Sequence, residues 1–102
     1  MSAEAENVTL VARFRAKNGQ DLTVSRLITK YGEAVRAEAG NIFFDIYTDR
    51  EDSLAFVIIE RYRDEAAFQA HLDGEKGKVF NQELGPLVEG SGSTLQFLRI
   101  VS

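Results

Sequence analysis

The chain has 102 residues, of which 44% are hydrophobic and 27% charged, as is typical of one small globular domain. Its 12 basic and 16 acidic residues give a net charge of −4, which argues against binding to nucleic acid or to an anionic membrane surface. The absence of cysteine excludes disulfides, thiolate nucleophiles and thiolate metal sites, and no apolar run approaches the ~20 residues of a membrane span.

The N-terminal part predicts a tail and a first strand. Residues 1–7 are polar and acidic, so we expect a disordered tail rather than a signal peptide, and a cytoplasmic protein. The single domain is expected to span residues 8–102. Residues 8–15 alternate in the manner of a strand, and Lys17-Asn18-Gly19 predicts the turn that ends it.

A helix and two further strands follow. The helix is expected from Asp21, as its N-cap, to Ala39, with Gly40 as the residue after its C-terminus. Strands are predicted at 41–48, with Ile42, Phe44 and Ile46 on one face, and at 54–62. A polar connection of hairpin length joins these two strands.

The C-terminal third predicts two helical pieces and a last strand. Asp64 is expected to cap a helix over residues 65–73, with Phe68 and Leu72 facing inward. A second piece is expected over residues 78–84, with Val79, Phe80 and Leu84 facing inward. A glycine-rich hinge at 90–93 then leads to a strand at 94–101.

This order of elements is β-α-β-β-α-β. It predicts an α+β fold of the ferredoxin-like type, with a four-stranded antiparallel sheet and both long helices on one face. The strand at 54–62 is apolar on both faces as far as Ile59, whereas a strand with one wet face alternates. We therefore expect a homodimer in which a second copy covers the open face and each subunit encloses a cavity. The last strand is expected to reach across to the partner.

Four stretches of the chain resemble the antibiotic biosynthesis monooxygenase family, which includes small quinol monooxygenases. They read VTLVARFRAKNGQ from Val8, RAEAGNIFFDIYTD from Arg36, FVIIERYRDEAAFQAHL from Phe56 and KVF from Lys78. The resemblance extends from about Val8 nearly to the end of the chain. It implies a dimeric α+β barrel and, in some members, oxygenation of polycyclic or hydroquinone substrates without a metal or a flavin.

The chain departs from the family pattern at several positions. Lys76 stands where many relatives carry a second histidine, and Tyr62 stands where they often carry tryptophan. In the haem-degrading branch, an axial histidine lies on the segment that reads Asn81-Gln82-Glu83 here. A tryptophan of that branch falls on His71 and an asparagine on Ala12. These differences argue against haem degradation.

His71 and Glu60 are the candidate catalytic residues. Histidine is the residue type whose unperturbed pKa lies near neutrality, so the lone His71 is suited to take a proton from a phenol or hydroquinone in a closed cavity. The resulting anion can pass an electron directly to dioxygen, and no cofactor or metal is expected. Glu60 interrupts an apolar strand and would orient His71 or bind a substrate hydroxyl. The structural alternative for His71 is a helix histidine that only stabilises the fold. For Glu60 it is a buried ion pair with Arg13, Arg61 or Arg99, or a structural hydrogen-bond anchor.

A flat aromatic pocket is expected around these two residues. Its candidate substrate contacts, each also explicable as plain core, are Phe44, Phe56, Tyr62, Phe68 and Phe80. Asn41, at the start of a strand, is a candidate donor to a developing oxyanion, with a turn role as the alternative.

The sequence thus predicts a cofactor-independent monooxygenase that acts on a small quinol-like aromatic substrate and O₂. Two other functions remain open. One is a proton-transfer isomerase of a small carbonyl compound, which would turn over under nitrogen. The other is a non-catalytic dimeric binding or stress protein that sequesters a hydrophobic small molecule.

Overall fold

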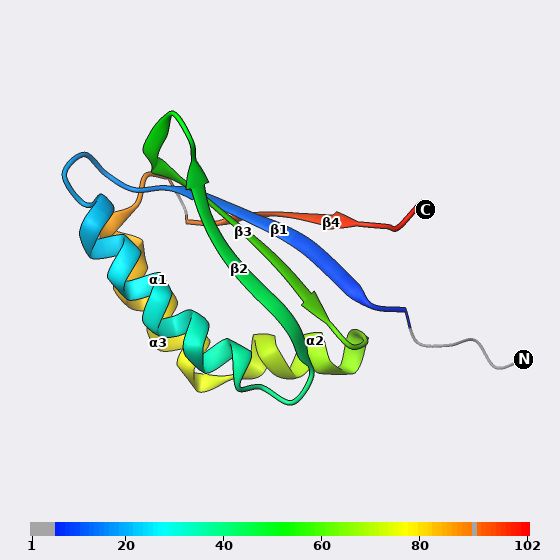
Figure 1. The fold of residues 1–102 in the computed structure, drawn as a ribbon. Helices are drawn as coiled ribbons and strands as arrows, with labels where there is room; N and C mark the ends of the chain where they lie inside the picture. The colour runs from blue at the N-terminus through cyan, green and yellow to red at the C-terminus, as the bar shows by residue number, and fades with distance from the viewer. Residues whose placement is uncertain (1–5, 91) are drawn as a thin grey trace, which may run out of the picture.

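A four-stranded antiparallel sheet and three α-helices form the fold of the computed structural model, which describes residues 6–90 and 92–102 (Figure 1). The elements are β1 (Val8–Arg15), α1 (Asp21–Arg36), β2 (Asn41–Asp49), β3 (Asp52–Tyr62), α2 (Glu65–Asp73), α3 (Glu75–Leu84), the 3₁₀ turn η1 (Gly85–Leu87) and β4 (Thr94–Leu98). This is the predicted ferredoxin-like α+β arrangement, with its second helical region divided into α2 and α3. Among the helices described, none combines the length and the apolar character needed to cross a membrane.

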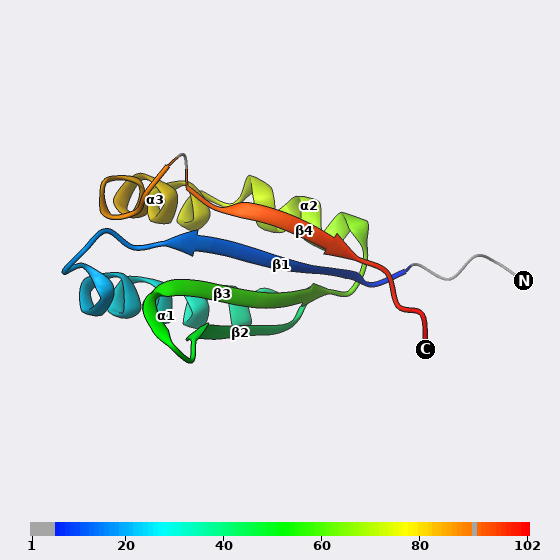
Figure 2. The same ribbon diagram turned by 90° about the horizontal axis from the view of Figure 1, so that it is seen from above.

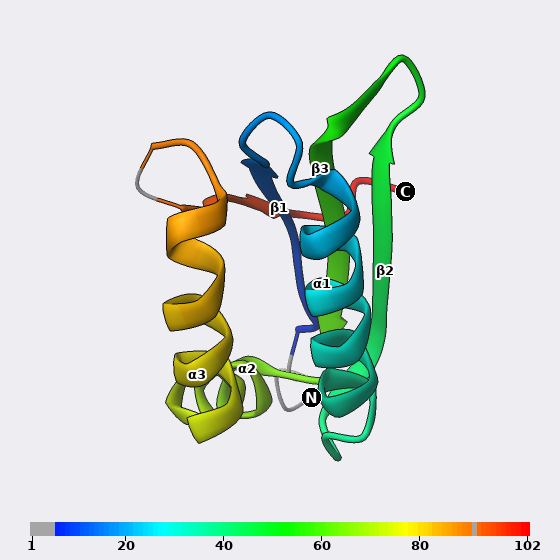
Figure 3. The same ribbon diagram turned by 90° about the vertical axis from the view of Figure 1, so that its left-hand side faces the viewer.

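The strands lie in the order β2-β3-β1-β4, as Figure 2 shows. The helices all cover one face of this sheet, with α1 and α3 side by side and α2 across one end (Figure 3). The register pairs Leu10 of β1 with Glu60 of β3 on one side and with Phe97 of β4 on the other. Since side chains alternate along a strand, the even-numbered residues of β1 and β3 point toward the helices.

The two faces of β3 differ in burial. Phe56, Ile58, Glu60 and Tyr62 are buried under the helices, whereas Val57 and its odd-numbered neighbours on the other face are only half-buried. Apolar side chains therefore lie on both faces, as the sequence predicts, and the helices cover one of them.

The segment between α1 and β2 differs from its prediction. The helix ends at Arg36 rather than Ala39, and Gln20 rather than Asp21 is its N-cap residue. Gly40 is not a helix cap: a Cβ at this position would overlap the Cβ of Ala67 in α2. The Gly40 carbonyl also accepts a hydrogen bond of 2.8 Å from the backbone N–H of Arg63. Glycine is needed here because the turn passes directly against α2.

The start of β2 also corrects the prediction. A shift in register between Asn41 and Phe43 breaks the expected alternation, so that Ile42 is 51% exposed. Phe44 and Ile46 do face the helices, opposite Glu60 and Ile58 of β3.

One predicted helix boundary changes in the second half of the chain. α3 begins at Glu75 rather than at residue 78, and includes Gly77 within its first turn. Phe68, Phe80 and Leu84 are buried as predicted, but Leu72 and Val79 are exposed. The apolar stripe of this region is therefore narrower than the sequence pattern indicates.

The last strand pairs within its own chain. β4 ends at Leu98 rather than at residue 101 and runs antiparallel to β1. Of the predicted hinge, Ser91 lies outside the described residues, as do residues 1–5 of the predicted tail.

Candidate active site

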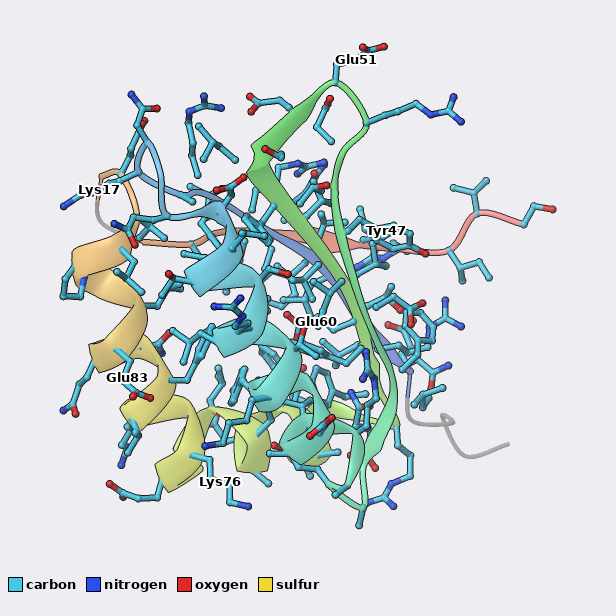
Figure 4. All side chains as sticks on the ribbon, turned by 60° about the vertical axis from the view of Figure 1, so that its left-hand side comes forward. Lys17, Tyr47, Glu51, Glu60, Lys76 and Glu83 are labelled. Carbon is cyan, nitrogen blue, oxygen red and sulfur yellow. The ribbon has the colours of Figure 1, made fainter. Side chains whose placement is uncertain are left out.

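A cavity of about 370 Å³ lies between the helix-covered face of the sheet and the three helices. This volume is near the lower end of the range for small-molecule sites, about 300–1,000 Å³. Most of its wall is apolar. The polar side chains that line it are Glu60, His71, Tyr31, Asn81 and Ser93. Figure 4 shows Glu60 amid the side chains between sheet and helices, whereas Glu51, Lys76 and Glu83 stand at the outside.

His71 reaches the cavity from α2. The helix begins at Asp64, whose carboxylate accepts a 2.8 Å hydrogen bond from the backbone N–H of Ala67, as an N-cap residue does. Phe68 and His71 are three residues apart and share one face of the helix. Both rings pack on Tyr62 of β3, with centroid distances of 5.4 and 4.8 Å. The side chain of His71 is only 10% exposed.

Glu38 contacts the histidine ring and was not a candidate from sequence. Its two carboxylate oxygens lie 3.0 and 3.2 Å from Nδ1 of His71. It belongs to the turn between α1 and β2 and is 35% exposed. No helical or strand spacing relates two residues 33 positions apart, so the sequence pattern gave no signal for this pair.

Glu60 is held by a neighbour on its own strand. Its Oε1 accepts a 2.7 Å hydrogen bond from the hydroxyl of Tyr62 and lies 4.0 Å from Nε2 of His71. Burial raises the pKa of the Glu60 carboxyl, although the hydrogen bond from Tyr62 and the nearby His71 oppose this effect. Burial and the adjacent Glu60 carboxylate likewise raise the pKa of the Tyr62 phenol.

The predicted ion pair between Glu60 and an arginine is wrong. Arg13 and Arg61 are odd-numbered and point to the other face of the sheet, where they donate to Gln96 and Thr9 at 2.9 Å. Arg99 follows β4 and is exposed.

Three of the six predicted substrate contacts lie in the cavity wall: Phe44, Phe68 and Phe80. The structure does not bring Phe56, Tyr62 and Asn41 to this wall. Phe56 is stacked on Phe14 with a centroid distance of 5.3 Å, and Phe14 rather than Phe56 lines the cavity.

Tyr62 and Asn41 lie outside this wall for different reasons. Tyr62 lies behind Glu60 and His71, with its hydroxyl committed to Glu60. The Asn41 amide donates to the carbonyls of Phe43 and Arg61 at 3.0 and 3.4 Å, so it stabilises the bulge in β2, and the structure favours its turn role.

Tyr31 of α1 completes the aromatic wall. Its ring is stacked on Phe80 with a centroid distance of 4.2 Å and meets Phe44 edge-on at 5.9 Å. Burial is the main cause of a raised pKa for its phenol. Tyr31 was not among the cavity residues predicted from the sequence.

The polar end of the cavity can hold a hydroxyl group. Nε2 of His71 and Oε1 of Glu60 are 4.0 Å apart, so one oxygen at ordinary hydrogen-bond lengths of about 2.7–2.9 Å reaches both. Within residues 6–90 and 92–102, no group of three or more histidine, aspartate or glutamate side chains is placed to hold a metal ion.

The family of the chain follows from its sequence and this fold together. A family model described as antibiotic biosynthesis monooxygenase (ABM) matches residues 7–83. The chain belongs to the ABM family. The resemblance carried by the four sequence stretches is thereby confirmed. No functionally curated protein matches the chain significantly.

Solved structures share the whole ABM fold. PA3566 from Pseudomonas aeruginosa has a TM-score of 0.88 and 28% identity, over 99% of this chain and 100% of that one. Rv0793 from Mycobacterium tuberculosis has a TM-score of 0.86 and 22% identity, covering 95% and 97%. A variant of SnoaB from Streptomyces nogalater, described as a cofactor-independent oxygenase, has a TM-score of 0.84 and 18% identity, covering 96% of each chain. The family match supports a monooxygenase. The structures of Rv0793 and SnoaB establish likeness of fold alone.

Proposed function

We propose that this ABM protein is a cofactor-independent monooxygenase that oxidises a hydroquinone or a related aromatic compound with O₂. The observation that carries the proposal is the pair formed by His71 and Glu60 at the polar end of an otherwise apolar cavity of about 370 Å³. Membership of the ABM family and the fold shared with SnoaB, a cofactor-independent oxygenase, support the same reaction class.

The cavity wall fits a neutral, flat substrate. Phe44, Phe68 and Phe80 offer aromatic surfaces, together with Tyr31. The described lining contains no lysine or arginine, so it offers no counter-ion to a carboxylated or phosphorylated substrate. A phenolic hydroxyl, by contrast, finds a partner at the polar end.

The proposed chemistry begins with a proton transfer. The substrate hydroxyl donates to Nε2 of His71, which accepts the proton. Burial raises the pKa of the Glu60 carboxyl. In its protonated form, this carboxyl donates a hydrogen bond to the developing oxyanion. The hydroquinone anion then transfers one electron to O₂. The semiquinone radical and superoxide combine to form a carbon–oxygen bond at a ring carbon, and the resulting peroxide takes back the proton from Nε2 of His71. Loss of water leaves a hydroxyquinone, with one oxygen atom in the product and the other in water.

A homodimer is also part of the proposal. The face of the sheet without helices carries Val57 and Ile59, both half-buried, with Tyr47 and Leu98 exposed. A second copy laid against this face would cover these side chains, and the two sheets would then form a barrel. The mass in solution, measured by light scattering during gel filtration, tests this; a monomeric mass at all concentrations would contradict it.

Oxygen uptake with a panel of hydroquinones tests the activity. The wild type is expected to exceed buffer autoxidation, and His71→Ala to lower the enzymatic rate by about 10²–10⁴-fold, as for the loss of a general base. Gln69→Ala, at an exposed position of the same helix, is the matched control. Uptake no faster than autoxidation would overturn the proposal. Turnover of a small carbonyl compound under nitrogen would support the isomerase instead, and binding without turnover would support a sequestering protein.

A further inference from the structure

We propose that Glu38 is a positioning residue for His71. Its carboxylate fixes the tautomer in which Nδ1 carries the proton, so that Nε2 presents its lone pair toward Glu60 and the cavity. This inference deepens the proposed function, in which Nε2 accepts the substrate proton. The tautomer itself is a property of the protein without substrate and is measured independently of any activity.

The geometry at Nδ1 determines the direction of the hydrogen bond. Both oxygens of Glu38 lie within hydrogen-bond distance of Nδ1, at 3.0 and 3.2 Å. An ionised carboxylate only accepts hydrogen bonds, so Nδ1 must donate. A neutral imidazole carries one N–H, which leaves Nε2 as the acceptor.

The surroundings keep the ring in this orientation. The His71 side chain is 10% exposed and lies against Tyr62 at 4.8 Å and Phe68 at 6.3 Å between ring centroids. These rings hold the plane of the imidazole, and the contact with Glu38 selects the orientation within that plane, because a ring turned by 180° would present a carbon to the carboxylate. With Nδ1 toward Glu38, Nε2 lies 4.0 Å from Oε1 of Glu60, a residue that lines the cavity.

The backbone holds Glu38 in place from both sides. Its own N–H donates to the carbonyl of Val35 at 2.9 Å, and its carbonyl accepts from the N–H of Asn41 at 3.1 Å. The carboxylate is thus part of a turn that is ordered before any substrate binds, which is the requirement for a preorganised site.

The position of the ring proton determines whether Nε2, on the side of Glu60, can accept a proton. The ionisable groups around the ring are Glu38, Glu60 and Tyr62, with Tyr31 at a centroid distance of 6.3 Å. Without Glu38, the remaining carboxyl near the ring is Glu60, on the Nε2 side at 4.0 Å. No acceptor then holds the single ring proton at Nδ1, and a ring that carries its proton at Nε2 can no longer accept a proton there from a substrate. Glu38 acts through His71, as the aspartate of a catalytic triad acts through its histidine.

Nitrogen NMR of the full chain with ¹⁵N-labelled histidine tests the tautomer. His71 is the only histidine, so the spectrum contains one pair of ring nitrogens. The neutral wild-type ring is expected to show Nδ1 as the protonated nitrogen and Nε2 as the unprotonated one. Glu38→Ala and Glu38→Met are expected to move the proton wholly or partly to Nε2. Glu33→Ala, an exposed glutamate of α1, is the control and should leave both signals unchanged.

Two results would overturn the inference: a wild-type ring protonated at Nε2, or ring signals that do not change in either Glu38 variant. The methionine variant preserves most of the side-chain volume, so it provides the measurement if the alanine variant does not fold. If the wild type consumes oxygen as proposed, both variants are expected to lower kcat by about 10-fold or more with little change in KM. If it does not, the NMR result still decides the role of Glu38, and only the proposed function fails.

Discussion

The hydroxyl of Tyr62 donates a 2.7 Å hydrogen bond to Oε1 of Glu60, and the two residues are 0% and 6% exposed. They are two positions apart on β3 and therefore share the face of the sheet that the helices cover. The hydrogen bond partly compensates the desolvation of the carboxyl, and the same oxygen lies 4.0 Å from Nε2 of His71. Tyr62 thus supports the site from behind the cavity wall.

Replacing Tyr62 by phenylalanine should reveal how much this hydrogen bond contributes to stability. The Tyr62→Phe variant keeps the ring but removes the donor, so a buried oxygen of Glu60 loses its partner. We expect a loss of about 1–3 kcal/mol in the free energy of unfolding, measured by urea denaturation. Tyr47→Phe, at an exposed tyrosine of β2, is the control. Equal stability of the two variants would show that the bond contributes nothing.

Glu60 should make stability depend on pH. Near pH 4.5, the ordinary pKa of a glutamate, the unfolded chain begins to lose the proton that the folded protein still retains, because burial raises the pKa of Glu60. The folded state is therefore penalised progressively as pH rises from there through the raised pKa, and the penalty is constant above it. Glu60→Gln has no proton to lose at this position.

The measurement is urea unfolding of wild type and Glu60→Gln from about pH 4 to about pH 8. The stability of the glutamine variant relative to wild type should increase across this window. Glu51→Gln, in the exposed turn between β2 and β3, is the control. If the difference in unfolding free energy between Glu60→Gln and wild type does not change with pH, burial does not penalise the charged form of Glu60.

Gly40→Ala should destabilise the protein through a clash with α2. Its new Cβ would overlap Ala67, and the turn that carries Glu38 would have to move. We expect a loss of about 1–3 kcal/mol, seen as a lower Tm in thermal denaturation. Gly85→Ala is the matched control, because a Cβ there meets nothing within 4 Å. A Tm for Gly40→Ala as high as that of the control would contradict this packing.

Asp64→Ala should weaken the helix that carries His71. It removes the acceptor for the Ala67 N–H, at an expected cost of about 0.5–2 kcal/mol in urea denaturation. Asp64→Asn should restore most of the loss, since an asparagine oxygen also caps helices. Asp73→Ala, at the other end of α2, serves as the comparison. If asparagine and alanine behave alike, capping is not the cause.

The sequence alone determined the fold of this protein and part of its site. Alternation at period two and apolar stripes at spacings of three to four gave all four strands, the helical regions and the cap at Asp64, because these patterns follow from local backbone geometry. The same patterns marked Glu60 as a charged residue in an apolar strand and His71 as a helix residue beside Phe68. The four stretches that resemble the ABM family gave the family, which the family match confirms.

Only the tertiary structure decided which side chains meet. Glu38 lies against His71, although 33 positions separate them, because the turn after α1 passes over α2. The bulge in β2 exposes Ile42, and the hydroxyl of Tyr62 is bound to Glu60 rather than free for a substrate. Local periodicity fixes the face on which a residue lies, but contacts between elements depend on how those elements pack. That packing places two carboxyl groups on opposite sides of the one imidazole ring.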